Sequence, residues 1–145
     1  MISKIIAIGS DHAGFALKTS IIKQLKDAYQ IINCGCESGE VSVDYPDFAK
    51  KVAEKIIKKE AEFGILICGS GIGISISANR FKEIRAALCH NQNVAKLSRK
   101  HNDANILCLG ARIIPEKNAY GIIKAFLETK FEGGRHIKRI EKLSK

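Results

Sequence analysis

The sequence contains no tryptophan and few other aromatic residues, which make up 6% of its 145 residues. Single-stranded nucleic acids are bound by clusters of aromatic side chains on which bases stack, and the chain lacks such clusters. No apolar run is long enough to cross a bilayer, and the apolar stretch at the N-terminus is too short for a secretory signal. We therefore expect a soluble, cytoplasmic protein that binds neither nucleic acid nor membrane.

The five cysteines are an odd number and form no C-x-x-C pair and no Cys/His spacing typical of zinc sites. We therefore expect neither a disulfide framework nor a structural metal, and we expect the thiols to be reduced. Four of the cysteines are interpreted as small buried hydrophobic residues, namely Cys34, Cys36, Cys89 and Cys108.

Length, hydrophobic content and charge narrow the class of protein further. With 46% hydrophobic residues, the chain suits one domain spanning residues 1–145. The net charge of +9 favours anionic partners, phosphorylated metabolites among them. Much of this charge comes from lysines on segments that are predicted to be helices. A solvated helix face explains these lysines more simply than a binding surface does.

Short apolar runs alternate with longer mixed segments, a pattern typical of repeated strand–helix units and a parallel sheet. The sequence therefore predicts an α/β fold. The expected strands are residues 5–8, 30–33, 64–68, 85–88 and 106–109. The expected helices are residues 15–26, 48–59, 92–100, 116–129 and 134–143.

Two segments are harder to assign. Isoleucine and alanine alternate with glycine and serine over residues 72–78, as in a strand, so residues 65–78 could form a β-hairpin. A helix is preferred because a parallel sheet needs a crossover before the next strand. Residues 35–47, with Gly39 and Pro46, are expected to form one long loop, and loops of that length often carry function.

Polar side chains follow the expected strands at their carboxyl ends, the edge at which open α/β sheets bind ligands. Asp11 and His12 follow the first strand, Cys68 and Ser70 the third, and Asn91 the fourth. Asp11 is explained equally well as the N-cap of the helix that follows it. A ligand site is expected at this edge of the sheet.

The segment after the third strand reads CGSGIG over residues 68–73. Glycine tolerates positive φ, so backbone N–H groups can converge there on an anion or on a developing oxyanion. The alternative is a tight turn that holds a buried structural cysteine.

Two further features lie toward the C-terminus. His101 ends an expected helix, where histidine is commonly only a cap. Arg135 and Arg139 are four residues apart, which would place them on one helical face and suits a phosphate held by two guanidinium groups. The alternative is a solvated basic tail.

Five motifs in this order resemble those of the family shared by ribose-5-phosphate isomerase B and the galactose-6-phosphate isomerase subunits. They are GSDHAGF at 9–15, DYP at 44–46, ICGSGIG at 67–73, SRKHND at 98–103 and EGGRH at 132–136. The resemblance runs nearly end to end. It implies a Rossmann-like three-layer α/β/α sandwich with a five-stranded parallel sheet, a helix at 72–79, and a homodimer or dimer of dimers.

The activity that the resemblance implies is interconversion of ribose 5-phosphate and ribulose 5-phosphate without a metal or cofactor, in the non-oxidative pentose phosphate pathway. The reaction passes through a cis-enediolate, so it needs a base, an oxyanion cradle, a ring-opening acid/base and a phosphate grip. Cys68 resembles the base of the family, and Ser70 with the N–H groups of residues 69–73 resembles the cradle. Members that use glutamate carry Gly at position 68 and Glu at position 74, whereas this chain has Cys68 and Ile74.

By the same resemblance, His101 with Asn102 opens the sugar ring, and both reach in from a neighbouring subunit together with Arg112. The implied substrate-binding residues are Asp11, His12, Tyr45, Gly69, Gly71, Ile72, Gly73, Asn102, Arg112, Arg135 and Arg139. The role of His136 is left open. Two alternatives remain: an isomerase of a six-carbon sugar phosphate such as allose or galactose 6-phosphate, and a non-catalytic phosphosugar-binding module that would need neither Cys68 nor His101.

Overall fold

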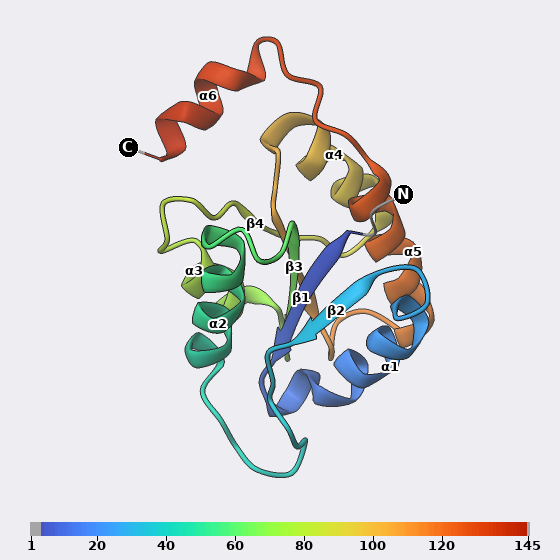
Figure 1. Ribbon diagram of the computed structural model, residues 1–145. Coiled ribbons are helices and arrows are strands. Elements are labelled where there is room, and N and C mark those ends of the chain that lie inside the picture. Colours follow the sequence, from blue (N-terminus) through green and yellow to red (C-terminus); the bar gives the residue numbers. More distant parts are fainter. Residues whose placement is uncertain (1–3, 145) are drawn as a thin grey trace.

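Five parallel strands form one sheet at the centre of the structure, a computed structural model that describes residues 4–144 (Figure 1). The sheet order is β2-β1-β3-β5-β4, and every neighbouring pair is parallel. The strands are β1 (Ile5–Ser10), β2 (Gln30–Asn33), β3 (Phe63–Cys68), β4 (Ala86–Leu88) and β5 (Ile106–Gly110). The predicted five-stranded parallel sheet is confirmed.

Helices cover both faces of this sheet and make a three-layer sandwich (Figure 1). One face packs against α1, α4 and α5, and the other against α2 and α3. The helices are α1 (Phe15–Leu25), α2 (Tyr45–Ile57), α3 (Ile72–Ala78), α4 (Gln92–Asn102), α5 (Glu116–Glu128) and α6 (His136–Leu143), and a 3-10 turn, η1 (His12–Gly14), precedes α1.

The central strand β3 shows most clearly why the sequence predicts this sheet. All of its residues are buried. Ile65 and Ile67 pack on the α1/α5 side, whereas Leu66 and Cys68 pack on the α2/α3 side. A parallel strand covered on both faces is apolar throughout rather than alternating, and this is why the sequence alone indicates the strand.

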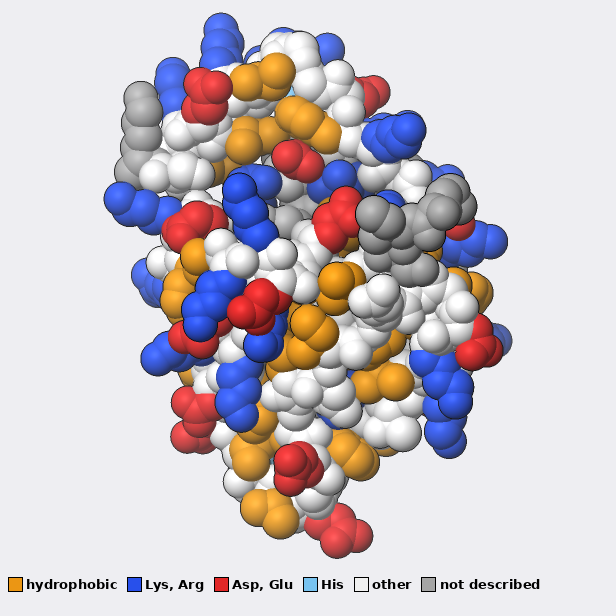
Figure 2. All heavy atoms as spheres, in the orientation of Figure 1, with side chains coloured by type: hydrophobic (Ala, Val, Ile, Leu, Met, Phe, Trp, Pro, Cys, Tyr) orange, Lys and Arg blue, Asp and Glu red, His pale blue; other side chains and the backbone are white. Residues whose placement is uncertain are grey.

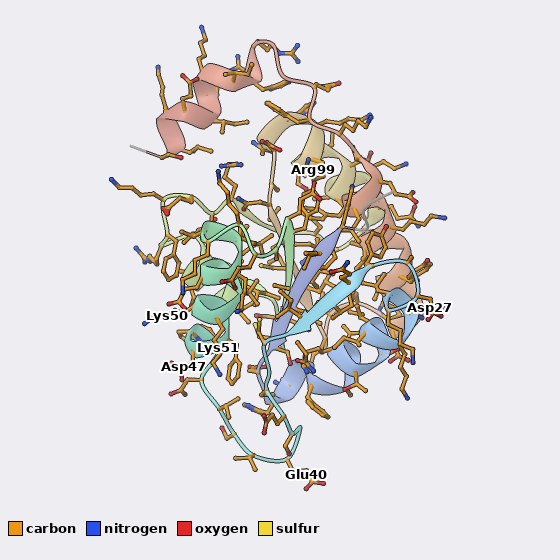
Figure 3. The ribbon with its side chains drawn as sticks, viewed as in Figure 1. Asp27, Glu40, Asp47, Lys50, Lys51 and Arg99 are labelled. Carbon is orange, nitrogen blue, oxygen red and sulfur yellow. The ribbon has the colours of Figure 1, made fainter. Side chains whose placement is uncertain are left out.

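The segment between β2 and α2 is shorter than predicted. Helix α2 begins at Tyr45, with Pro46 in its first turn, so the expected loop over residues 35–47 ends at Asp44. Proline suits a first helical turn because its missing N–H would have no partner there. Glu40 marks the tip of this segment (Figure 3).

Residues 72–78 form helix α3, so the alternative of a β-hairpin is wrong. Ile74 and Ala78 are buried, whereas Ile72 and Ile76 are 53% and 52% exposed. Residues four apart share a helical face, so two isoleucines face solvent while Ile74 and Ala78 face the core. The hydroxyl of Ser75 donates to the carbonyl of Ile72 at 2.8 Å, which suits serine inside a helix.

Arg99 fixes the C-terminal end of α4 (Figure 3). Its guanidinium group is buried and donates to a carboxylate oxygen of Asp103 at 2.9 Å and to the carbonyl oxygens of Ala104 at 2.6 Å and Thr129 at 3.1 Å. The last bond ties α4 to the residue that follows α5. A buried charge with this many partners holds the end of α4 in place.

On the face shown in Figure 2, the positive charge is dispersed. Lys and Arg side chains are interspersed with Asp and Glu over the visible face rather than gathered into one patch (Figure 2). This distribution agrees with solvated helix faces. Among residues 4–144, no helix combines the length and the apolar character that a membrane crossing requires.

Candidate active site

A pocket of about 540 Å³ lies at the carboxyl edge of the sheet, where β1, β3 and β5 end. It is lined by Asp11, Tyr45, Cys68, Gly69, Ser70, Ile72, Gly73, Arg112 and Ile113. A larger cavity of about 1100 Å³ lies beside β2 and α2, but none of the predicted site residues lines it. The smaller pocket is the better candidate because a thiol, a carboxyl group and a guanidinium group meet there.

Cys68 is the last residue of β3 and is 4% exposed. Its Sγ accepts a hydrogen bond from the backbone N–H of Gly71 at 3.2 Å, and its carbonyl oxygen accepts one from Ala111 at 2.9 Å. The strand and the following turn therefore hold the sulfur in one position. An N–H donor at sulfur binds more strongly as the sulfur gains negative charge.

Gly71 closes the turn between β3 and α3 in a left-handed conformation, with φ of +79°. A Cβ there would lie 2.5 Å from the side chain of Leu88 and 2.8 Å from the backbone of Leu109. Ser70 Oγ accepts from the N–H of Ile72 at 3.1 Å. Two N–H groups of the predicted oxyanion cradle therefore already donate hydrogen bonds inside the turn: that of Gly71 to Cys68 Sγ, and that of Ile72 to Ser70 Oγ.

Asp11 both caps a helical turn and lines the pocket. Its Oδ1 accepts from the N–H of Gly14 at 3.1 Å, and its own N–H donates to the carbonyl of Ile67 at 3.2 Å. These bonds join the end of β1 to the end of β3, beside Cys68. The two interpretations of Asp11 from the sequence are therefore compatible.

Tyr45 and Arg112 both line the pocket, each beside a glycine of the turn after β3. The ring of Tyr45 lies against the first turn of α3, where a Cβ on Gly73 would be 2.5 Å from Tyr45 Cζ. The guanidinium group of Arg112 lies beside Gly69, with a nitrogen 3.1 Å from where a Cβ of that glycine would be. A side chain at position 73 would displace the ring of Tyr45, and one at position 69 would require the flexible side chain of Arg112 to shift.

Arg112 lines the pocket of its own chain, whereas the resemblance implies that it reaches in from a neighbouring subunit. Its backbone N–H donates to the carbonyl of Gly69 at 2.9 Å. Because β5 pairs directly with β3, the turn after Gly110 returns beside the loop after Cys68. The side chain is thereby delivered to the pocket of its own chain.

His12 and Asn91 lie near this edge but do not line the pocket. His12 Nδ1 accepts from the N–H of Val43 at 3.2 Å and so holds the segment between β2 and α2. The side-chain oxygen of Asn91 accepts from the N–H of Val94 at 2.8 Å and caps α4.

The remaining predicted residues gather at the opposite end of the molecule. His101 and Asn102 end α4, which runs back to the amino edge of the sheet before β5 begins. Arg135 caps α6 and Arg139 lies one turn further on, as their spacing predicts. Helix α6 packs against α4 and lies far from the segment between β2 and α2 (Figure 1). Within one chain, none of these four residues lines the pocket at Cys68.

His101 has neighbours that the sequence did not indicate. Its ring stacks on that of His136, with ring centroids 4.6 Å apart and ring planes 18° apart. Its Nε2 lies 3.6 Å from Oε1 of Glu132, which is also 3.8 Å from Nε2 of His136. Burial and the charge of Arg135 lower the pKa of His136, so this ring is neutral at neutral pH.

Comparison with known proteins identifies the family. The sequence profile of the Ribose/Galactose Isomerase family matches residues 6–143. The chain belongs to this family. The relatives named below are called isomerases, and the chain is accordingly an isomerase with a Rossmann-like α/β fold.

Three relatives illustrate the similarity. Ribose-5-phosphate isomerase B of Escherichia coli is 44% identical over 97% of this chain and 95% of its own. The crystal structure of a ribose 5-phosphate isomerase from Thermotoga maritima is 50% identical, covers 97% of both chains and superposes with a TM-score of 0.95. A Rickettsia bellii protein named "Putative sugar phosphate isomerase" is 53% identical over 95% of this chain and 96% of its own.

Proposed function

We propose that this isomerase interconverts ribose 5-phosphate and ribulose 5-phosphate, as part of the non-oxidative pentose phosphate pathway. The observation that carries the proposal is the pocket at the end of β3, where the buried thiol of Cys68 faces a space shared with Asp11, Tyr45 and Arg112. A relative with that activity in its name is 44% identical over nearly the whole chain, which supports the assignment of the substrate.

Cys68 acts as the base in this proposal. Its thiolate takes the proton from C2 of the open-chain aldose; the C–H electron pair forms the C1–C2 double bond, and the carbonyl electron pair moves onto O1 to give a cis-enediolate. The hydroxyl proton passes from O2 to O1 within the enediolate, and the Cys68 thiol returns its proton to C1. This leaves a carbonyl group at C2, the ketose, and regenerates the thiolate. Placement of sulfur at a strand end, with an N–H donor at 3.2 Å, supports this role because a base must be held within reach of the proton that it moves.

Ring opening requires a second group, for which we propose His101 and Asn102 of the partner subunit. In one chain His101 lies at the amino edge of the sheet and Cys68 at the carboxyl edge. A two-fold dimer can bring the amino edge of one copy against the carboxyl edge of the other and so form two composite sites. The enzyme is therefore proposed to act as a homodimer or a dimer of dimers.

The phosphate is proposed to be held by guanidinium groups from both chains. Arg112 supplies one from the wall of the pocket. Arg135 and Arg139 supply two more from α6 of the partner subunit, where both are exposed, and His12 contributes its free ring nitrogen. Charge-assisted bonds of this kind are the strong contacts to a phosphate.

The proposal is tested by replacing Cys68 with alanine and measuring isomerisation of ribose 5-phosphate. Loss of a proton-transfer base should lower kcat by about 10²- to 10⁴-fold while binding of the sugar phosphate persists. Cys34→Ala, which removes a thiol that lines the other cavity, is the matched control and should leave turnover unchanged. Near-normal turnover by Cys68→Ala would refute the assignment of the base.

The substrate is tested separately with a panel of ribose, allose and galactose phosphates on the wild-type enzyme. The proposal predicts the highest kcat/KM for ribose 5-phosphate. A higher value for allose 6-phosphate or galactose 6-phosphate would assign the enzyme to a six-carbon substrate. Binding of these sugars without turnover of any of them would indicate a phosphosugar-binding module.

A further inference from the structure

Three metal-ligating side chains converge where α4 ends and α6 begins, away from the pocket at Cys68. They are His101, Glu132 and His136, and one ligand atom from each lies within 4.8 Å of the other two. The distances to Glu132 Oε1 are 3.6 Å from His101 Nε2 and 3.8 Å from His136 Nε2. The distance from His136 is slightly longer than the separation of about 3.4 Å between neighbouring ligands around a tetrahedral zinc ion with bonds of about 2.1 Å.

His136 supplies an independent indication of a ligand between these groups. Its side chain is only 8% exposed, yet Nε2 makes no hydrogen bond. Within residues 4–144 it is the one buried side-chain nitrogen or oxygen left without a partner. A buried polar atom without a partner is costly, and a metal ion bound to this nitrogen would remove that cost.

Two of the three groups are free to adjust to a metal. His101 and Glu132 are 40% and 51% exposed, so they can turn toward a fixed His136. Such a turn is required of His101, because a metal lies in the plane of each imidazole that binds it and the two rings are stacked.

We propose that His101, Glu132 and His136 form a binding site for a divalent transition-metal ion, with Zn²⁺ the best fit. Two imidazole nitrogens and one carboxylate oxygen are borderline ligands that favour zinc over Mg²⁺ or Ca²⁺, which prefer oxygen alone. Three protein ligands leave a fourth position for water.

The consequence for the enzyme is inhibition, and this step rests on the proposed function. If His101 opens the sugar ring, a metal on its Nε2 removes the nitrogen that would carry the proton. Zinc would then inhibit reversibly, and a chelator would restore activity. The metal takes no part in the proposed reaction cycle, although its site shares His101 with that cycle.

The site is tested by titrating the reduced, full-length protein with Zn²⁺ by calorimetry and with Co²⁺ by absorption spectroscopy. We expect one ion per chain and cobalt bands of nitrogen and oxygen ligation, without the sulfur charge-transfer band that the five free cysteines would give. Glu132→Gln and His136→Ala should each weaken binding at least about tenfold. His90→Ala removes an exposed histidine outside the cluster and should bind as the wild type does.

Three results would overturn the proposal: no binding at micromolar metal, a cobalt spectrum of thiolate ligation, or binding that Glu132→Gln and His136→Ala leave unchanged. Glu132 is half exposed, so its variant reports on the site even where loss of the buried His136 disturbs folding. Failure of the catalytic proposal gives a different result. Metal that binds as expected but leaves isomerisation unaffected would support the site and contradict the role of His101.

Discussion

Substitution of Gly71 by alanine tests whether the turn after β3 is as constrained as the structure indicates. The left-handed φ of +79° costs a residue with a Cβ about 1–2 kcal/mol. The Cβ would also lie 2.5 Å from Leu88 Cδ1 and 2.8 Å from the backbone of Leu109, and overpacking of that kind costs about 1–3 kcal/mol. We therefore expect Gly71→Ala to lower the free energy of unfolding by about 2–5 kcal/mol.

Gly134→Ala is the matched control. Gly134 also has a positive φ, of +58°, but a Cβ there would meet nothing within 4 Å. Its cost should be the backbone contribution alone, about 1–2 kcal/mol. Both variants are measured by urea unfolding at one protein concentration, because self-association would make stability depend on concentration.

Activity gives a second measure of the same substitution. The N–H of Gly71 donates to Cys68 Sγ, so a shifted turn also displaces the sulfur. A displacement of about 1 Å can cost about 10²-fold in rate, so Gly71→Ala should lower kcat by roughly that factor. Equal destabilisation by the two variants, or full activity of Gly71→Ala, would refute this explanation of the turn.

Two further predictions concern charge and pH. Arg139→Ala should weaken binding of ribose 5-phosphate by about ten- to hundredfold and make that binding less sensitive to salt. Lys142→Ala, on the same helix, should leave the affinity unchanged. Equal losses of affinity in the two variants would show that the basic C-terminus is only a solvated tail. Burial raises the pKa of Cys89 from 9.0 to about 11, so as the pH rises the thiol ionises in the unfolded chain before it ionises in the folded protein. The contribution of the neutral thiol to the free energy of unfolding is fully present below pH 9 and is lost as the pH rises toward 11. Urea unfolding on either side of that range should show a loss larger by about 2–3 kcal/mol in the wild type than in Cys89→Ala. An equal loss in both would show that Cys89 titrates normally.

Most of the sheet could be predicted because buried parallel strands are apolar on both faces. The run before Cys68 is an example, and all of its residues are buried. The start of α2 could not be placed, since Pro46 and its acidic neighbours fit a loop and a first helical turn equally well. The alternation at residues 72–78 left a hairpin open for a related reason: Ile72 and Ile76 are exposed, so local hydrophobicity did not report burial, and the preference for a helix came from the architecture.

Half of the candidate site could be predicted, because topology places the ends of β1, β3 and β5 at one edge. The topology brings Asp11, Cys68 and Ser70 together. It cannot bring His101 to them, since α4 returns to the other edge within the same chain. The grouping of His101 with Glu132 and His136 was also hidden, because it depends on how α6 packs against α4 rather than on any local spacing.

The central claim is that Cys68 of one subunit works with His101 of the partner subunit, and mixing two inactive variants tests it most directly. In a mixed dimer of Cys68→Ala and His101→Ala subunits, one site carries both lesions and the other carries neither. Random reassortment makes roughly half of the dimers mixed, so activity should return to roughly a quarter of the wild-type value. The variants are refolded together, exchange is verified by mass, and turnover of ribose 5-phosphate is assayed. Recovery to about that level is the predicted result, and verified exchange without recovered activity would contradict the composite site.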